Sequence, residues 1–150
     1  MIRVLSPDYA PETVRIWREA IAISGPRMFG ADQLAACTAR VRTPDVMAHE
    51  MAERHVLGWE EDGALVGFAE LKPDGHVDRV YVTRAGRGIG TALVRTLIET
   101  VRERNLAELH TEASDLARPV FARLGFTHEG RREIDLDGVP LHNHAMRMRL

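Results

Sequence analysis

The sequence predicts an α/β fold of the mixed, α+β kind. We expect helices on both faces of a mixed, mostly antiparallel central sheet of about seven strands. Three observations predict this arrangement. Strand-like runs joined by tight turns lie between residues 55 and 82, which favours antiparallel pairing. A helix and a further strand follow them, which favours some parallel pairing. Two strand-like runs turned at Asp137-Gly138 then end the chain.

The totals describe an ordinary globular chain. Its 150 residues suggest one domain over 1–150, and 45% of them are hydrophobic and 28% charged. A net charge of -2 does not suggest nucleic acid as the main partner. No apolar run approaches the roughly 20 residues that span a bilayer, so we expect no membrane association. The single cysteine, Cys37, and the lack of a signal-peptide pattern fit a cytoplasmic protein.

The first part of the chain reads as a short strand followed by helices. The expected spans are Ile2–Leu5 for the strand, Ala10–Ile23 for a long helix and residues 31–54 for two helical pieces broken at Thr43-Pro44. In the long helix, Val14, Trp17 and Ile21 recur at helical spacing between charged residues. We therefore expect this helix to bury one face against the sheet.

The central part reads as three antiparallel strands that lead into a glycine-rich turn. Their spans are residues 55–60, 64–71 and 76–82. The helix after the turn is the clearest in the chain, because Leu93, Leu97 and Val101 lie four apart and Asn105 is a plausible left-handed stop. The remaining spans are a strand at 106–113, a short helix from Ser114 or Asp115 to Gly125, and strands at 126–136 and 141–150.

The stretch Val80–Thr91 contains a short strand, a glycine-rich turn and a helix start. Glycine allows positive φ and leaves no Cβ between the backbone and an approaching group. The first turn of a helix adds unpaired N–H groups and a partial positive charge. These features together indicate a phosphate or pyrophosphate site.

Two motifs resemble the GNAT superfamily of acyl-CoA-dependent N-acetyltransferases. The loop is similar to the family's acyl-CoA signature, with Gly88 and Gly90 at its two small positions and Ala85 where the signature prefers Gln or Arg. Thr111–Phe126 is similar to the later motif, in which a polar residue caps a helix that ends in Leu-Gly-Phe. The tail Gly138–Met146 resembles the YafP-like branch of small bacterial GNAT proteins, as does the stretch around Pro73 to Asp78.

The resemblance implies a GNAT-like fold and transfer of an acetyl group from acetyl-CoA to a primary amine of a small molecule or peptide, by direct attack. It implies that backbone groups of Val80 and Val82 bind the pantetheine arm, beside Tyr81. The pyrophosphate would be held by N–H groups of the loop: Gly86, Arg87, Gly88, Ile89, Gly90 and Thr91. Further cofactor contacts would come from the later motif: Ser114, Arg118 and Phe121.

The catalytic groups have several candidates. The general base could be Asp78, Glu70, Glu112 or a water molecule. Strand alternation would place Asp78 on the same face as Val80, and His76 with them. Phe121 replaces the Tyr that often serves as general acid in the family, so Tyr81, Ser114 or water would protonate the leaving thiolate instead.

The acceptor and the other ligands are less defined. Met28 and Phe29 are placed to line a substrate pocket, but the amine itself is unknown. His142 and His144 share a face of the last strand and could bind zinc, yet no third or fourth ligand is evident, so we expect no metal. We expect a monomer or a homodimer.

Two other functions compete with acetyl transfer. A GNAT-like module that binds acyl-CoA as a sensor, without turnover, would fit the departures at Ala85 and Phe121. A dinucleotide-binding oxidoreductase is set aside because Thr91 stands where its last glycine belongs.

Overall fold

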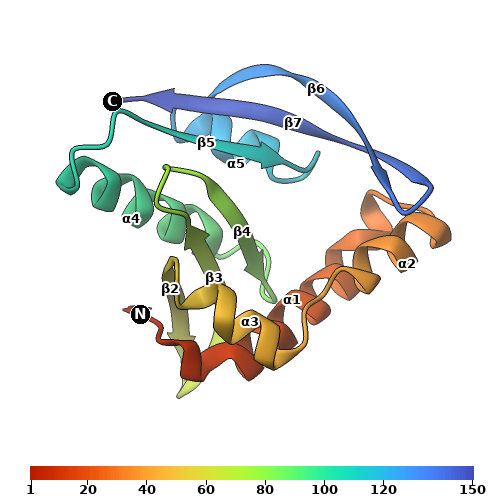
Figure 1. The fold of residues 1–150 in the computed structure, drawn as a ribbon, viewed down its shortest axis with the longest axis horizontal. Helices are drawn as coiled ribbons and strands as arrows, with labels where there is room; N and C mark the ends of the chain where they lie inside the picture. Colours follow the sequence, from red (N-terminus) through yellow and green to blue (C-terminus); the bar gives the residue numbers. More distant parts are fainter.

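The computed structural model describes residues 1–150 as strands and helices in the order expected from the sequence (Figure 1). The strands are β1 (Ile2–Val4), β2 (His55–Glu61), β3 (Ala64–Leu71), β4 (Val77–Val82), β5 (Glu108–Ala113), β6 (Thr127–Leu136) and β7 (Val139–Arg149). The α-helices are α1 (Ala10–Ser24), α2 (Ala31–Ala39), α3 (Pro44–Met51), α4 (Ile89–Glu103) and α5 (Arg118–Arg123), with 3-10 turns at Pro7–Tyr9 and Gly25–Arg27. None of the helices combines the length and the apolar character that a membrane crossing needs.

The strands form two antiparallel sheets instead of one mixed sheet. Their orders are β1-β2-β3-β4 and β5-β7-β6. The expected parallel pairing is reduced to one bridge between His76, which directly precedes β4, and His110 within β5. Beyond that bridge the Thr111 hydroxyl donates to the Val77 carbonyl at 2.8 Å. This carbonyl of β4 therefore accepts from a side chain of β5 and not from its backbone. The two sheets separate past this point.

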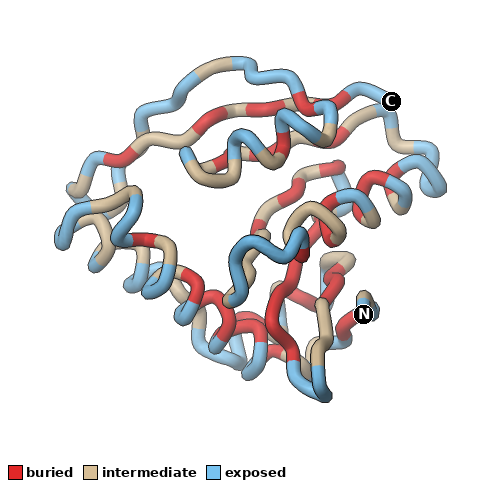
Figure 2. The backbone as a smooth tube through the Cα atoms, turned by 180° about the vertical axis from the view of Figure 1, so that it is seen from behind, coloured by how far each residue is buried: buried red, intermediate tan, exposed pale blue.

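The four-stranded sheet is covered on both faces, as expected. The helix α4 packs on one face, and its residues Leu93, Leu97 and Val101 join a buried cluster that extends to β5 and α5. The helices α1 and α3 pack on the other face, around Trp17 and Phe68. Figure 2 shows the buried backbone concentrated where these layers meet.

Several local sequence signals are confirmed. The Thr43 side chain accepts a hydrogen bond from the Val46 N–H at the start of α3, where the break between the two helical pieces was expected. Asn105 adopts φ 57° just after α4. Asp137 and Gly138 adopt φ 52° and φ 90°, the left-handed pair that a two-residue hairpin turn needs.

The hairpin of β6 and β7 extends from the second sheet to α2. The Gln33 side chain on α2 donates to the Pro140 carbonyl on β7 at 3.0 Å. Figure 1 shows the tip of this hairpin beside α2, on the far side of the gap between the sheets from α4. The N-terminal helices therefore meet the C-terminal hairpin across the opening.

Candidate functional site

The outer edge of β4 carries backbone groups that face the opening. The Thr83 N–H donates to the Val66 carbonyl on β3 at 2.9 Å. Because N–H groups alternate sides along an extended strand, those of Val80 and Val82 point to the opposite edge. The neighbouring strand β5 pairs with this part of the chain only at His76, before β4 begins. No strand therefore covers the N–H groups of Val80 and Val82, and they are free to bind a ligand.

A β-bulge interrupts β4 just before these donors. Leu71 pairs with Val77 and Ala69 with Val80, so one residue of β3 lies opposite two residues of β4. The bulge breaks the strict alternation of side chains along the strand. The prediction that Asp78 and Val80 share one face is therefore wrong. The Asp78 side chain turns toward the end of α3, where an arginine binds it, whereas Val80 packs against the cluster under α4. Asp78 nevertheless lines the cavity described below.

The glycine loop presents a row of unused donors. The N–H groups from Gly86 to Thr91 have no backbone acceptor, and the first bond of α4 runs from the Ala92 N–H to the Gly88 carbonyl. Gly88 takes φ 71° as the N-cap of α4, and Gly86 takes φ 75°. A Cβ at either glycine would meet open space. The loop therefore has the free donors, the helix start and the room that an anionic group requires.

The side chains of the loop contribute less than its backbone. Arg87 donates to Glu61 at 2.9 Å, and Arg84 donates to the same carboxylate at 2.7 Å. Both arginines thus fasten the loop to the end of β2. Ile89 is buried in the core, so only its backbone N–H is available.

The later motif forms the facing wall. The Ser114 hydroxyl accepts from the Ala117 N–H at 3.2 Å and caps the turn that leads into α5, as expected. Phe121 is buried edge-on to Phe126 with ring centres 5.0 Å apart. Ser114 and Phe121 both line the cavity, whereas Arg118 is exposed at the first residue of α5.

A cavity of about 620 Å³ connects these parts. One end is lined by the β4 edge, the loop and the later motif, including Val80, Val82, Gly86 and Gly90. The other end is lined mainly by apolar residues of α1, α2 and the turns beside them. These include Trp17, Ile21, Met28, Phe29, Cys37 and Arg40. Met28 and Phe29 thus line a cavity, and its use as a substrate pocket stays a prediction.

Two predicted carboxylates, Asp78 and Glu112, reach this cavity from opposite sheets. The Asp78 carboxylate accepts from Arg54 at 2.7 Å. The Glu112 carboxylate lies 2.5 Å from the His76 Nε2 and 3.2 Å from Arg132. Each is therefore held in place by cationic or histidine partners.

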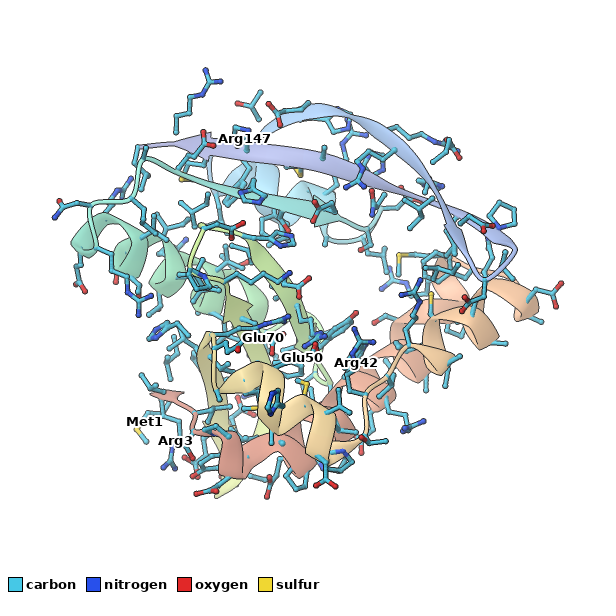
Figure 3. All side chains as sticks on the ribbon, in the orientation of Figure 1. Met1, Arg3, Arg42, Glu50, Glu70 and Arg147 are labelled. Atoms are coloured by element: carbon cyan, nitrogen blue, oxygen red, sulfur yellow. The ribbon has the colours of Figure 1, made fainter.

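The third predicted carboxylate, Glu70, lies elsewhere. It is 0% exposed, does not line the cavity, and accepts from Arg79 at 3.0 Å and Arg54 at 3.2 Å. Burial raises the pKa of the Glu70 carboxyl, and the two arginines oppose that rise. Arg79 also donates to Glu50 at 3.0 Å, and Figure 3 shows Glu50, Glu70 and Arg42 gathered between α3 and the sheet. Glu70 thus belongs to a buried ion network.

Tyr81 lines the cavity as an aromatic wall. Its ring stacks on Trp17 with centres 5.7 Å apart and planes at 20°. Burial raises the pKa of Tyr81 to about 12. A phenol with that pKa is a poor proton donor to a thiolate, whose conjugate acid titrates near 8.5. Burial likewise raises the pKa of the Cys37 thiol, which disfavours its thiolate.

A further cluster lies beside the cavity wall. The Nε2 atoms of His142 and His144 lie 2.9 Å and 2.7 Å from the Asp115 carboxylate. These hydrogen bonds, that of His144 first, lower the pKa of Asp115. Asp115 is 27 residues from His142 along the chain, so no local spacing could have joined them.

The rest of the cavity also depends on distant contacts. Cys37 and Arg40 belong to α2 and the residue after it, about a third of the chain away from the glycine loop at the other end of the cavity. No motif marks them, because the lining of this end of the cavity is set by how α1 and α2 pack across the opening. No sequence signal marks Arg54 or Arg79, because a charged residue directly precedes each of them in the chain.

Two splayed sheets, an open strand edge and a glycine-rich helix start define this site as that of an acyltransferase domain. The Acetyltransferase (GNAT) domain family matches residues 6–150, and the chain belongs to this family. No curated relative matches the sequence. The YafP-like branch stays a prediction.

Solved structures share the fold over the whole chain. A GCN5-related N-acetyltransferase from Rhodopseudomonas palustris is 28% identical with a TM-score of 0.92, and the match covers 100% of this chain and 95% of that one. The PaiA N-acetyltransferase of Thermoplasma acidophilum, solved with coenzyme A, is 18% identical with a TM-score of 0.81 and coverage of 100% and 98%. A phosphinothricin acetyltransferase of Sinorhizobium meliloti, solved with acetyl-CoA, is 18% identical with a TM-score of 0.78 and coverage of 100% and 88%.

Proposed function

We propose that residues 1–150 form one domain that transfers the acetyl group of acetyl-CoA to a primary amine of a small molecule or peptide. The observation that carries the proposal is the row of donors from Gly86 to Thr91, free of backbone acceptors at one end of a large cavity. The structural neighbours solved with coenzyme A or acetyl-CoA support this choice of donor. The tail Gly138–Met146 supports the YafP-like branch.

The loop is suited to the pyrophosphate of the donor. Its N–H groups and the start of α4 offer hydrogen bonds and positive potential to an anion. The exposed edge at Val80 and Val82 is suited to the amide groups of the pantetheine arm, which would extend β4 by strand-like pairing. Ser114 and Phe121 would cover the arm from the opposite side.

The chemistry assigns each of these groups a task. Acetyl-CoA supplies an activated thioester: the amine nitrogen bonds to the acetyl carbon, the C–S bond breaks, and the thiolate takes up a proton. An N–H donor of β4 aimed at the thioester oxygen would lower the barrier by about 3 kcal/mol. The Ser114 hydroxyl keeps its own proton free, because it accepts from the Ala117 N–H, and it can donate that proton to the thiolate.

The base must take a proton from an alkyl ammonium that titrates near 10.4. Asp78 and Glu112 remain the candidates because both line the cavity. Either could take the proton directly or through one water molecule. Glu70 is left out of this role because two arginines bind it outside the cavity. The Asp78→Asn and Glu112→Gln variants separate the two: the base is the one whose loss lowers kcat by about 10²–10⁴ and removes the acidic limb of the pH profile.

The function is tested by release of CoA thiol from acetyl-CoA across a panel of amines. Because the acceptor end is lined by Trp17, Met28 and Phe29, the panel includes apolar amines as well as polyamines and peptide N-termini. Amine-dependent release, with the acetylated product identified by mass, would support the proposal. Binding of acetyl-CoA by calorimetry, with no turnover on any amine, would favour the sensor module instead.

A further inference from the structure

We propose that Asp115, His142 and His144 form a binding site for a divalent transition-metal ion, with Zn²⁺ the best-matched ion. Asp115 comes from the loop between β5 and α5, and the histidines from one face of β7. One ligand atom from each of the three side chains lies within 4.8 Å of the others. Two imidazoles and a carboxylate are a donor set that zinc prefers, whereas calcium and magnesium prefer oxygen alone.

The spacing of the ligand atoms suits a small ion. The Asp115 Oδ1 lies 2.7 Å from the His144 Nε2 and 2.9 Å from the His142 Nε2. Ligand atoms on a tetrahedral zinc ion lie about 3.3 Å apart, since each bond is about 2.0–2.1 Å long. Binding therefore requires the carboxylate to retreat by about half an ångström. The three ligand atoms spread over as much as 4.8 Å, so the half-exposed His142 ring must also turn toward His144 to reach the same ion. The Asp115 side chain is 48% exposed at a loop, so it has room to do so.

The backbone and a neighbouring side chain restrict the histidines to positions suited to binding an ion. β7 is the central strand of its sheet. His144 pairs with Ala113 on β5 and with Arg131 on β6, so its imidazole projects from a doubly paired backbone, whereas His142 pairs with β6 alone. The His144 side chain is 7% exposed, and its Nδ1 lies 3.0 Å from the His128 Nε2. Metal-binding histidines commonly have their second ring nitrogen held by such a partner, which fixes the ring for the ion.

Three protein ligands leave one tetrahedral position for water or for an added ligand. Glu133 is the partner of His142 on β6, but Arg131 binds its carboxylate at 2.7 Å. It is therefore not counted as a fourth ligand.

The site lies beside the cavity without lining it. Asp115 is flanked by Ser114 and Leu116, which both line the cavity, whereas none of the three ligands does. An ion at Asp115 would tie this wall to β7. The site is separate from the groups proposed for acetyl transfer, so metal binding can be tested without activity.

The test uses the full chain, without a polyhistidine tag, after treatment with a chelator. Zn²⁺ is titrated by calorimetry, and Co²⁺ serves as a spectroscopic probe of a site with nitrogen and oxygen ligands. We expect one ion per chain and visible Co²⁺ bands. The Asp115→Asn and His142→Ala variants change exposed or half-exposed side chains, and each should weaken Zn²⁺ binding by at least about tenfold.

Two further variants serve as matched controls. His49→Ala removes an exposed histidine from α3, and Cys37→Ser removes the single thiol. Both should bind Zn²⁺ as the wild type does. The proposal is overturned if the wild type binds no Zn²⁺, or if Asp115→Asn and His142→Ala bind it with unchanged affinity. Loss of binding in either control alone would place the ion elsewhere and would overturn it too.

Discussion

The guanidinium of Arg79 lies over the indole of Trp17, with its central carbon 4.6 Å from the ring centre. Tyr81 stacks on the same indole, and both aromatic rings line the cavity. The indole therefore joins the buried ion network around Arg79 to the end of the cavity that is proposed to take the acceptor. Cation–π contacts of this kind contribute up to about 2 kcal/mol when shielded from water.

This connection makes Glu70 a structural residue whose loss should be costly. The Glu70→Gln change removes the buried negative charge that Arg79 and Arg54 share. Breaking a buried ion pair from one side typically destabilises by about 3–5 kcal/mol, and we expect a loss near the lower figure because the amide oxygen still accepts a hydrogen bond. Urea unfolding measures it. As a control, Glu19→Gln breaks an exposed pair with Arg15 and should cost less than about 0.5 kcal/mol. Equal losses in the two variants would contradict the network.

Ionisation of Glu50 should make the stability of the fold depend on pH. Burial alone would raise the pKa of Glu50, but Arg79 and Arg42 outweigh it and hold the pKa below the ordinary 4.5. The folded state then releases this proton more readily than the unfolded state. The stabilisation is fully present above pH 4.5 and is lost as the pH falls through the lowered value. We expect Glu50→Gln to be less stable than the wild type by about 2 kcal/mol at pH 7 and the difference to shrink below pH 4.5. A difference that is constant with pH would rule out this linkage.

The resemblance to the GNAT motif predicts that Phe121 stands in place of a tyrosine acid. Phe121 is 3% exposed and lines the cavity. The Phe121→Tyr change would place a phenol there, and we expect kcat to rise or to stay unchanged. If the new hydroxyl finds no partner, stability falls by about 1–3 kcal/mol, which urea unfolding records separately. A collapse of kcat in a folded variant would instead mean that the ring packs against the cofactor too tightly for a hydroxyl.

The fold could be predicted where the signal is local. The spacing of Leu93, Leu97 and Val101 determines the buried face of α4, and Asp137-Gly138 determines the last turn. The division into two sheets could not be predicted, because the bridge between His76 and His110 and the Thr111 hydrogen bond that follows it join segments 34 residues apart. The bulge between Val77 and Val80 could not be predicted either, because no glycine or proline marks it. The extra residue also redirects Asp78, so the face assigned by simple alternation was wrong.

The candidate site divides in the same way. The loop Gly86–Thr91 is contiguous in sequence, and its composition alone indicates an anion site. The role of Glu70 depends on Arg54 and Arg79 from two other elements, and the neighbour of His142 is a carboxylate from another loop. A sequence pattern cannot show such pairs, because they are created only when distant segments pack together.

The loop assignment itself is tested by Gly88→Val. A side chain at Gly88 would enter the open space in front of the N–H row, where the pyrophosphate is expected, and valine is also disfavoured at φ 71°. Losing two charge-assisted hydrogen bonds of about 1.5 kcal/mol each would weaken acetyl-CoA binding about a hundredfold, while the fold survives.

The matched control is Gly63→Val in the turn between β2 and β3. Gly63 takes φ 78° and its Cβ would also meet open space, so this variant carries the same backbone strain away from the N–H row. Calorimetry with acetyl-CoA compares the two, and urea unfolding should show similar losses of stability. Unchanged affinity in Gly88→Val, or an equal loss in both variants, would mean that the donors from Gly86 to Thr91 do not hold the cofactor.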